Sequence, residues 1–143
     1  MWILYAIIAA IVWGIDYVLV ERIIKFISIE SLIAIELLAV GIIFAAVAYF
    51  NDHIQQDLAA VFSSRKLLLL TLGGIAAFSL GNLFIMLSIE KKNATLAGFI
   101  EISYPLFIAL FSWLLFKENQ LTLGTLIGGG LIMVGVFVIY SFN

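Results

Sequence analysis

Five long apolar stretches decide which environment this chain can fold in. They cover about residues 2–20, 31–50, 67–89, 94–116 and 123–140, and few charges interrupt them. A helix needs about 20 mainly apolar residues to cross the roughly 30 Å hydrocarbon core of a bilayer. Lipid offers no hydrogen-bond partners to the backbone, so only helices and closed barrels span it, and these uninterrupted runs lack the alternation of barrel strands. The sequence therefore predicts an all-α integral membrane protein, a five-transmembrane-helix bundle in one domain covering residues 1–143.

Composition agrees with a membrane protein and excludes several other classes. Hydrophobic residues make up 65% of the chain and charged residues 11%, whereas soluble domains carry about 25% charged residues. A net charge of −2 leaves no basic surface for nucleic acid. The chain has no cysteine and a single histidine, His53, which excludes disulfides, thiol nucleophiles and a histidine metal cluster within one chain. We expect no metal, no cofactor and no enzymatic activity.

The longest link between apolar stretches, residues 51–66, has a pattern of its own. Asp52 followed by Gln55 resembles a capping box at the start of a helix. Apolar side chains then recur at helical spacing, at Ile54, Leu58, Val61 and Phe62. The pattern predicts a short helix over about 53–63 that lies in the membrane interface. A loop without regular structure is the alternative.

Basic residues in the links give no clear orientation, although their excess normally marks the cytoplasmic side. With a cytoplasmic N-terminus, the inner links carry Arg65, Lys66 and Lys117, and the outer links carry Arg22, Lys25, Lys91 and Lys92. This balance favours insertion in both orientations, so that two copies form an antiparallel homodimer with inverted symmetry. One fixed orientation, set by other features, is the alternative.

Four polar residues within the apolar stretches share one depth in the membrane. Asp16 and Asn82 precede the ends of the first and third stretches, while Glu36 and Glu101 follow the starts of the second and fourth. Because neighbouring spans alternate in direction, all four lie about 8–11 Å below the same surface. Charges at this depth are costly and usually mark a functional site.

The fourth stretch carries the strongest local signal, because Pro105 is the only proline in the chain. A proline within a helix leaves the carbonyl four residues earlier without its donor, and that residue is Glu101. Tyr104 precedes the proline. A mostly small or polar helix face, suited to lining a cavity, is formed by Gly98, Glu101, Pro105, Ala109 and Ser112. The alternative is a kink that only packs against a neighbouring helix.

Aromatic residues surround the acid of the first stretch. Trp13 lies one turn before Asp16, and Tyr17 follows it. Aromatic faces beside a carboxylate suit an organic cation, and an acid that takes a cation and a proton in turn produces exchange. Bonding to a neighbouring helix is the alternative for Asp16, Glu36 and Asn82. The predicted substrate- and proton-binding residues are Glu101, Asp16, Trp13, Tyr17, Glu36, Asn82, Tyr104 and Pro105.

The last stretch contains no charge and many small residues, which allow helices to approach closely in lipid. Its glycines predict a dimer contact, or else tight packing inside one chain, at Gly124, Gly128, Gly129 and Gly135.

Two segments resemble a known family. The opening AIIAAIVWGIDYVLVE resembles the first helix of EamA-type members of the drug/metabolite transporter superfamily. The fourth and fifth helices of an EamA domain resemble SIEKKNATLAGFIEISYPLFIALFSWLLFKENQLTLGTLIGGGLIMVGV, with its proline, its Lys117–Glu118 corner and its glycine-rich end. The resemblance implies a single five-helix repeat. Larger members carry two inverted repeats and move amino acids, metabolites, nucleotide sugars or toxic compounds.

The scale of the chain and the glycines at its end are also similar to the small multidrug resistance branch. In that branch, antiparallel dimers exchange cations for protons. This chain departs from it in having five spans and in the later position of Asp16. The resemblance implies a transporter in the inner cell membrane that exchanges protons for a small organic metabolite or a cationic drug-like compound, as a homodimer with alternating access. The alternatives are a non-transporting subunit paired with another half-transporter, and a flippase for a lipid-linked metabolite.

Overall fold

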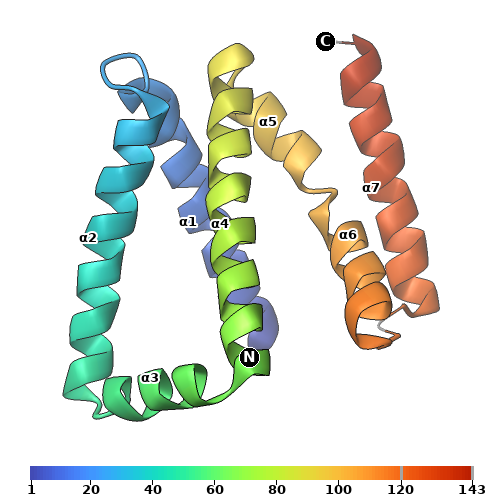
Figure 1. The fold of residues 1–143 in the computed structure, drawn as a ribbon. Coiled ribbons are helices and arrows are strands. Elements are labelled where there is room, and N and C mark those ends of the chain that lie inside the picture. The colour runs from blue at the N-terminus through green and yellow to red at the C-terminus, as the bar shows by residue number, and fades with distance from the viewer. Residues whose placement is uncertain (120, 143) are drawn as a thin grey trace. The chain divides into compact units, whose positions relative to one another are not determined.

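The computed structural model describes residues 1–119 and 121–142, and the regular structure within these ranges is helical throughout (Figure 1). The predicted all-α class is therefore confirmed. The segments long and apolar enough to cross a membrane are Trp2–Ile23, Ile29–Phe50, Arg65–Lys91, Ala94–Phe116 and Leu123–Phe142. The chain divides into two compact units, one formed by Met1–Leu19 with Lys91–Asn143 and the other by Val20–Glu90.

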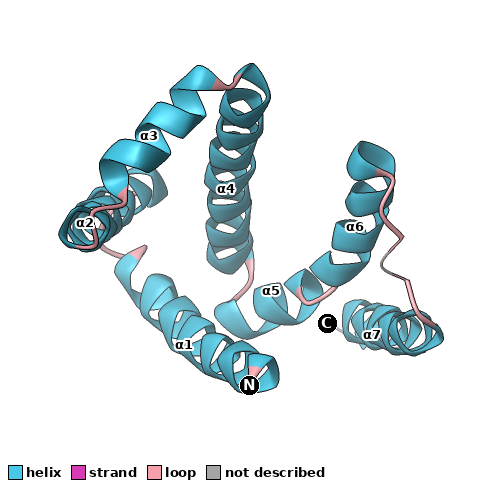
Figure 2. Cartoon of the chain, turned by 90° about the horizontal axis from the view of Figure 1, so that it is seen from below, coloured by secondary structure: helices cyan, strands magenta, loops and turns pink. Residues whose placement is uncertain are grey.

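The Val20–Glu90 unit consists mainly of two long helices joined by a short one. Helix α2 covers Ile29–Phe50, α3 covers Ile54–Ser63 and α4 covers Arg65–Lys91. In both views α3 crosses from the end of α2 to the start of α4 (Figures 1 and 2). A hydroxyl fixes the start of α2, since Ser28 Oγ accepts a hydrogen bond from the Ser31 backbone N–H at 3.3 Å.

Helix α3 lies in the segment for which the sequence pattern predicts an interfacial helix, but it begins differently. Its N-cap is His53, which makes no side-chain capping bond. Asp52 has a φ of 57°, whereas the first residue of a capping box needs extended backbone. The predicted capping box is therefore wrong. Phe62 is 73% exposed and Leu58 is also exposed, as expected of a helix whose apolar face contacts lipid.

The other unit contains most of α1 (Trp2–Ile23) and a fourth span built from several segments. Helix α5 covers Ala94–Glu101 and α6 covers Tyr104–Phe111, with a two-residue turn between them (Figure 1). The Asn93 side chain accepts a hydrogen bond from the Leu96 N–H at 2.8 Å and so caps the start of α5. The span is thus interrupted within the membrane.

The interruption follows from the proline in the first turn of α6. Pro105 has no N–H to offer the Glu101 carbonyl, and its ring crowds that carbonyl. The chain tightens here, with Ser103 N–H donating to the Ile100 carbonyl at 3.2 Å and Leu106 N–H donating to the Ser103 carbonyl at 3.1 Å. The sequence predicts one kinked helix over 94–116. The structure instead has two helices, α5 and α6, separated by the turn that follows Glu101.

The fourth span ends in a π-helical turn, Ser112–Phe116. Lys117 follows with a left-handed φ of 59°, and its N–H donates to the Trp113 carbonyl at 3.0 Å. The Lys117 ammonium lies 5.1 Å from the centroid of the Trp113 ring, a cation–π contact. This turn leads into α7, Leu123–Phe142.

Helix α7 packs closely on α6 at one glycine. Gly129 is buried, and a Cβ added to it would lie 2.5 Å from Leu106 Cδ2. Few other side chains are buried among the described residues, and these are apolar: Val20, Ile29, Leu32, Met86, Ile89, Ala94 and Ala97. The large apolar side chains that remain exposed suit lipid, where a buried core is not the driving force for packing.

Candidate functional site

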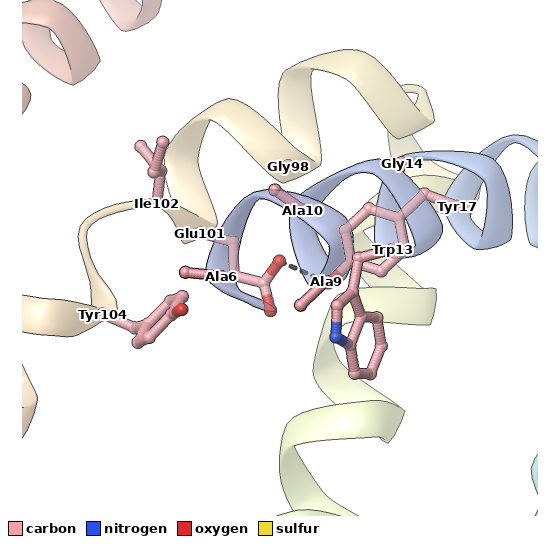
Figure 3. Close-up of a pocket in the computed structure, with 10 residues that line it drawn as sticks. All are labelled: Ala6, Ala9, Ala10, Trp13, Gly14, Tyr17, Gly98, Glu101, Ile102 and Tyr104. Carbon is pink, nitrogen blue, oxygen red and sulfur yellow. Dashed lines mark hydrogen bonds between the residues drawn. The ribbon is translucent and has the colours of Figure 1, made fainter. Parts of the chain in front are cut away.

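A groove of about 590 Å³ runs along α1 and the end of α5, within one unit (Figure 3). Helix α1 contributes one face, since its lining residues recur every three or four positions. The groove is lined by Ala6, Ala9, Ala10, Trp13, Gly14, Tyr17, Gly98, Glu101, Ile102 and Tyr104. Since α1 and α5 are both membrane-spanning segments, the groove lies at membrane depth.

A hydrogen bond joins the two sides of the groove. The Tyr17 hydroxyl on α1 donates to Glu101 Oε2 at the end of α5 (Figure 3). Gly98 lies one turn before Glu101 on the same helix. A Cβ at Gly98 would lie 3.5 Å from the Tyr17 ring, so the ring rests directly against the α5 backbone. The contact of the ring with α5 at Gly98 places the hydroxyl within reach of the carboxylate.

Aromatic rings border this carboxylate. Trp13 packs edge-on against Tyr17, with ring centroids 5.9 Å apart and planes at 75°. Trp13 and Tyr104 are 49% and 55% exposed, and both line the groove. Aromatic faces carry partial negative charge and attract cations, and the residues that line the groove include no lysine, arginine or histidine. The charges and rings that line the groove therefore favour a positive over a negative ligand.

The end of α5 adds to this preference. The last carbonyls of a helix carry a partial negative charge, and the Glu101 carbonyl lacks the donor that Pro105 cannot supply. The negative charge of the side-chain carboxylate and the partial negative charge of the helix end therefore both lie at Glu101. Interrupted membrane helices with exposed ends are used by transporters to hold substrates and ions.

The structure brings together four of the predicted site residues. Trp13, Tyr17, Glu101 and Tyr104 all line the groove. Pro105 does not line it but causes the turn that ends α5. Because the turn changes the helical register, the predicted single face does not hold, and Ala109 and Ser112 lie outside the groove.

The other predicted polar residues lie elsewhere. Asp16 is half-buried beside Tyr17, at the edge of the lining face of α1, and does not line the groove. Glu36 and Asn82 belong to the Val20–Glu90 unit. Asn82 Nδ2 donates to the Phe78 carbonyl of its own helix at 2.9 Å, and Glu36 is half-buried on α2.

Sequence reasoning did not identify the small residues of the α1 wall: Ala6, Ala9, Ala10 and Gly14. The signal was present, because these positions fall in line with Trp13 and Tyr17 at helical spacing. The prediction relied on polar groups within the apolar stretches and therefore did not include these four residues.

The four glycines predicted to pack differ in their surroundings. Gly129 contacts Leu106 within the same chain. A Cβ at Gly128 or Gly135 would meet nothing within 4 Å, and one at Gly124 would meet only the Thr122 hydroxyl, at 3.7 Å. Gly129 thus has a packing role inside the chain, whereas a dimer contact at the other three stays a prediction.

Comparison with protein families matches the chain to the model of the EamA-like transporter family over residues 1–141. Searches of curated proteins and of solved structures give no match, so the likeness to the small multidrug resistance branch stays a prediction. The match covers nearly the whole chain and agrees with its five apolar helices. It identifies a multi-pass membrane protein of a family of transporters, not of enzymes. The chain belongs to the EamA-like transporter family.

Proposed function

We propose that this chain is one half of a transporter that binds a small organic metabolite or drug-like compound, preferentially a cation, in the groove at Glu101. The observation that carries the proposal is the hydrogen bond between Tyr17 and the Glu101 carboxylate in a groove bordered by aromatic rings. An acid held within a membrane span is costly and usually has a functional role. A bound cation provides the positive charge that balances the carboxylate.

Proton exchange follows from the two forms of the same carboxyl group. The charged form of Glu101 attracts a cation and accepts the Tyr17 hydrogen bond, whereas the protonated form has no charge to offer. Binding of a cation and binding of a proton therefore exclude each other, and a carrier that alternates between the two sides of the membrane exchanges one for the other.

Uptake into proteoliposomes tests this function. The wild-type protein is reconstituted, and benzyltrimethylammonium, whose charge does not depend on pH, is supplied outside vesicles with an acidic lumen. One-for-one exchange across about two pH units accumulates the cation up to about 100-fold, because each 1.4 kcal/mol is a factor of ten. An ionophore that collapses the pH gradient should abolish the accumulation. Uptake that ignores the gradient would contradict proton exchange.

A second copy in the opposite orientation completes the proposed transporter in the inner cell membrane. The near-equal basic charge on the two sides supports insertion both ways, and inverted pairs give the two-sided symmetry that alternating access requires. C-terminal fusions to alkaline phosphatase, active only outside the cytoplasm, and to green fluorescent protein, fluorescent only inside, test this. We expect signal from both fusions. Signal from one alone would exclude the antiparallel homodimer.

A further inference from the structure

The α1 wall of the groove offers mainly methyl groups to whatever binds at Glu101. Ala6 and Tyr17, the two ends of this wall, are eleven positions apart, about 16 Å along the helix axis. Besides Trp13, Gly14 and Tyr17, it presents only the alanines at positions 6, 9 and 10 (Figure 3). These alanines do more than form a helix face of small residues, because they line a cavity that also contains a hydrogen-bonded carboxylate.

We propose that Ala6, Ala9 and Ala10 set the size of the apolar group that a cation bound at Glu101 carries, and that the substrates are monovalent organic cations with a bulky apolar group. The proposal rests on the proposed function. It adds the substrate class and the residues that select it.

The charged residues that line the groove determine how many positive charges a substrate carries. Glu101 is the only carboxylic acid among the lining residues, and no lysine, arginine or histidine accompanies it. One carboxylate balances one positive charge. A second cationic group on the same molecule would lie against alanine methyl groups and rings, where a charge without a partner is strongly disfavoured. The groove therefore selects one charge per molecule.

The volume and lining of the groove set the apolar part. A cation as small as tetramethylammonium contacts the carboxylate and little else in a space of about 590 Å³. A cation with an attached ring system also places that ring system against the alanine methyl groups and the faces of Trp13 and Tyr104, and so removes it from the aqueous solution. Removal of apolar surface from water favours binding in proportion to the area covered. Affinity should thus increase with the apolar group until the groove is filled.

A series of cations with the same head group separates these effects. Binding of tetramethylammonium, benzyltrimethylammonium, biphenylmethyl-trimethylammonium and the dication decamethonium is measured by calorimetry on the purified full chain, and exchange is measured in proteoliposomes. We expect the biphenyl compound to bind the wild type best. The Ala6→Leu and Ala10→Leu variants should each weaken it about tenfold, because added carbon atoms overfill the groove, while tetramethylammonium changes less than about twofold. Ala46→Leu, the same change at an exposed position of α2, is the matched control.

The outcomes that overturn the inference differ from those that overturn the proposed function. If the leucine variants weaken all monovalent cations equally, the alanines do not select substrates. If decamethonium binds as well as the biphenyl compound, the groove does not select one charge per molecule. In both cases only the inference fails. If the wild type binds tetramethylammonium as tightly as the biphenyl compound, the inference fails in the same way. If the wild type neither binds nor exchanges any cation of the series, the proposed function itself fails.

Discussion

Replacement of Glu101 by glutamine should abolish the pH-driven exchange of benzyltrimethylammonium. Glutamine keeps the shape of the side chain but carries no charge and does not exchange a proton at its amide. Removal of one partner of a buried charge pair costs about 2–5 kcal/mol, which is at least about 30-fold in binding. Initial uptake rates in proteoliposomes, with and without a pH gradient, measure the effect. We expect no accumulation above the level of empty vesicles.

Two further variants make this result specific. Glu118→Gln makes the same chemical change at an exposed position outside the groove, and it should exchange like the wild type. Tyr17→Phe keeps the ring against Gly98 and removes only the hydroxyl that donates to Glu101. A hydrogen bond to a charged group contributes about 1.5–3 kcal/mol, so its rate should fall by about tenfold or more. A Glu101→Gln protein with full rate and full gradient dependence would remove Glu101 from the mechanism.

Replacement of Gly129 by valine should lower the free energy of unfolding by about 1–3 kcal/mol, the usual range for overpacking. The reason is the close approach of α7 to α6, where even a Cβ at Gly129 would lie 2.5 Å from Leu106 Cδ2. Because Leu106 directly follows Pro105, this contact also fixes α6 next to the turn that ends α5. Unfolding of the purified protein in mixed micelles, followed by circular dichroism, measures the loss.

The neighbouring glycine provides a matched control. A Cβ at Gly130 would meet nothing within 4 Å, so Gly130→Val makes the same change of residue without the clash. It should stay within about 0.5 kcal/mol of the wild type, as most exposed substitutions do. Leu106→Ala should restore part of the stability lost in Gly129→Val by making room for the added methyl groups. Equal destabilisation by the two valine variants would show that the loss does not come from the contact with Leu106.

The sequence alone determined the class of fold, and four of the residues that it singles out, Trp13, Tyr17, Glu101 and Tyr104, line the groove in the structure. Apolar runs of about 20 residues can only be satisfied as helices in lipid, which is why the five spans are readable without a structure. The cost of polar groups at that depth singled out Glu101, and Trp13 and Tyr17 were singled out as the aromatic residues beside Asp16, which itself does not line the groove. These inferences need only the length and period of one helix at a time.

The tertiary structure decided which helix faces meet, and with them the membership of the groove. Asp16, like Glu101, is a carboxylic acid that the sequence places at the same depth of the membrane. It nevertheless lies beside the lining face of α1 and not on it. The hydrogen bond of Tyr17 joins it to Glu101, 84 positions later in the chain, and depends on the contact of the Tyr17 ring with α5 at Gly98. The faces of a membrane helix that contact lipid and those that contact other helices are both mainly apolar. Hydropathy therefore does not predict how each helix is rotated about its own axis relative to its neighbours. That rotation is fixed by close contacts such as Gly129 with Leu106 and by the turn that Pro105 imposes after Glu101, and both are properties of the packed chain.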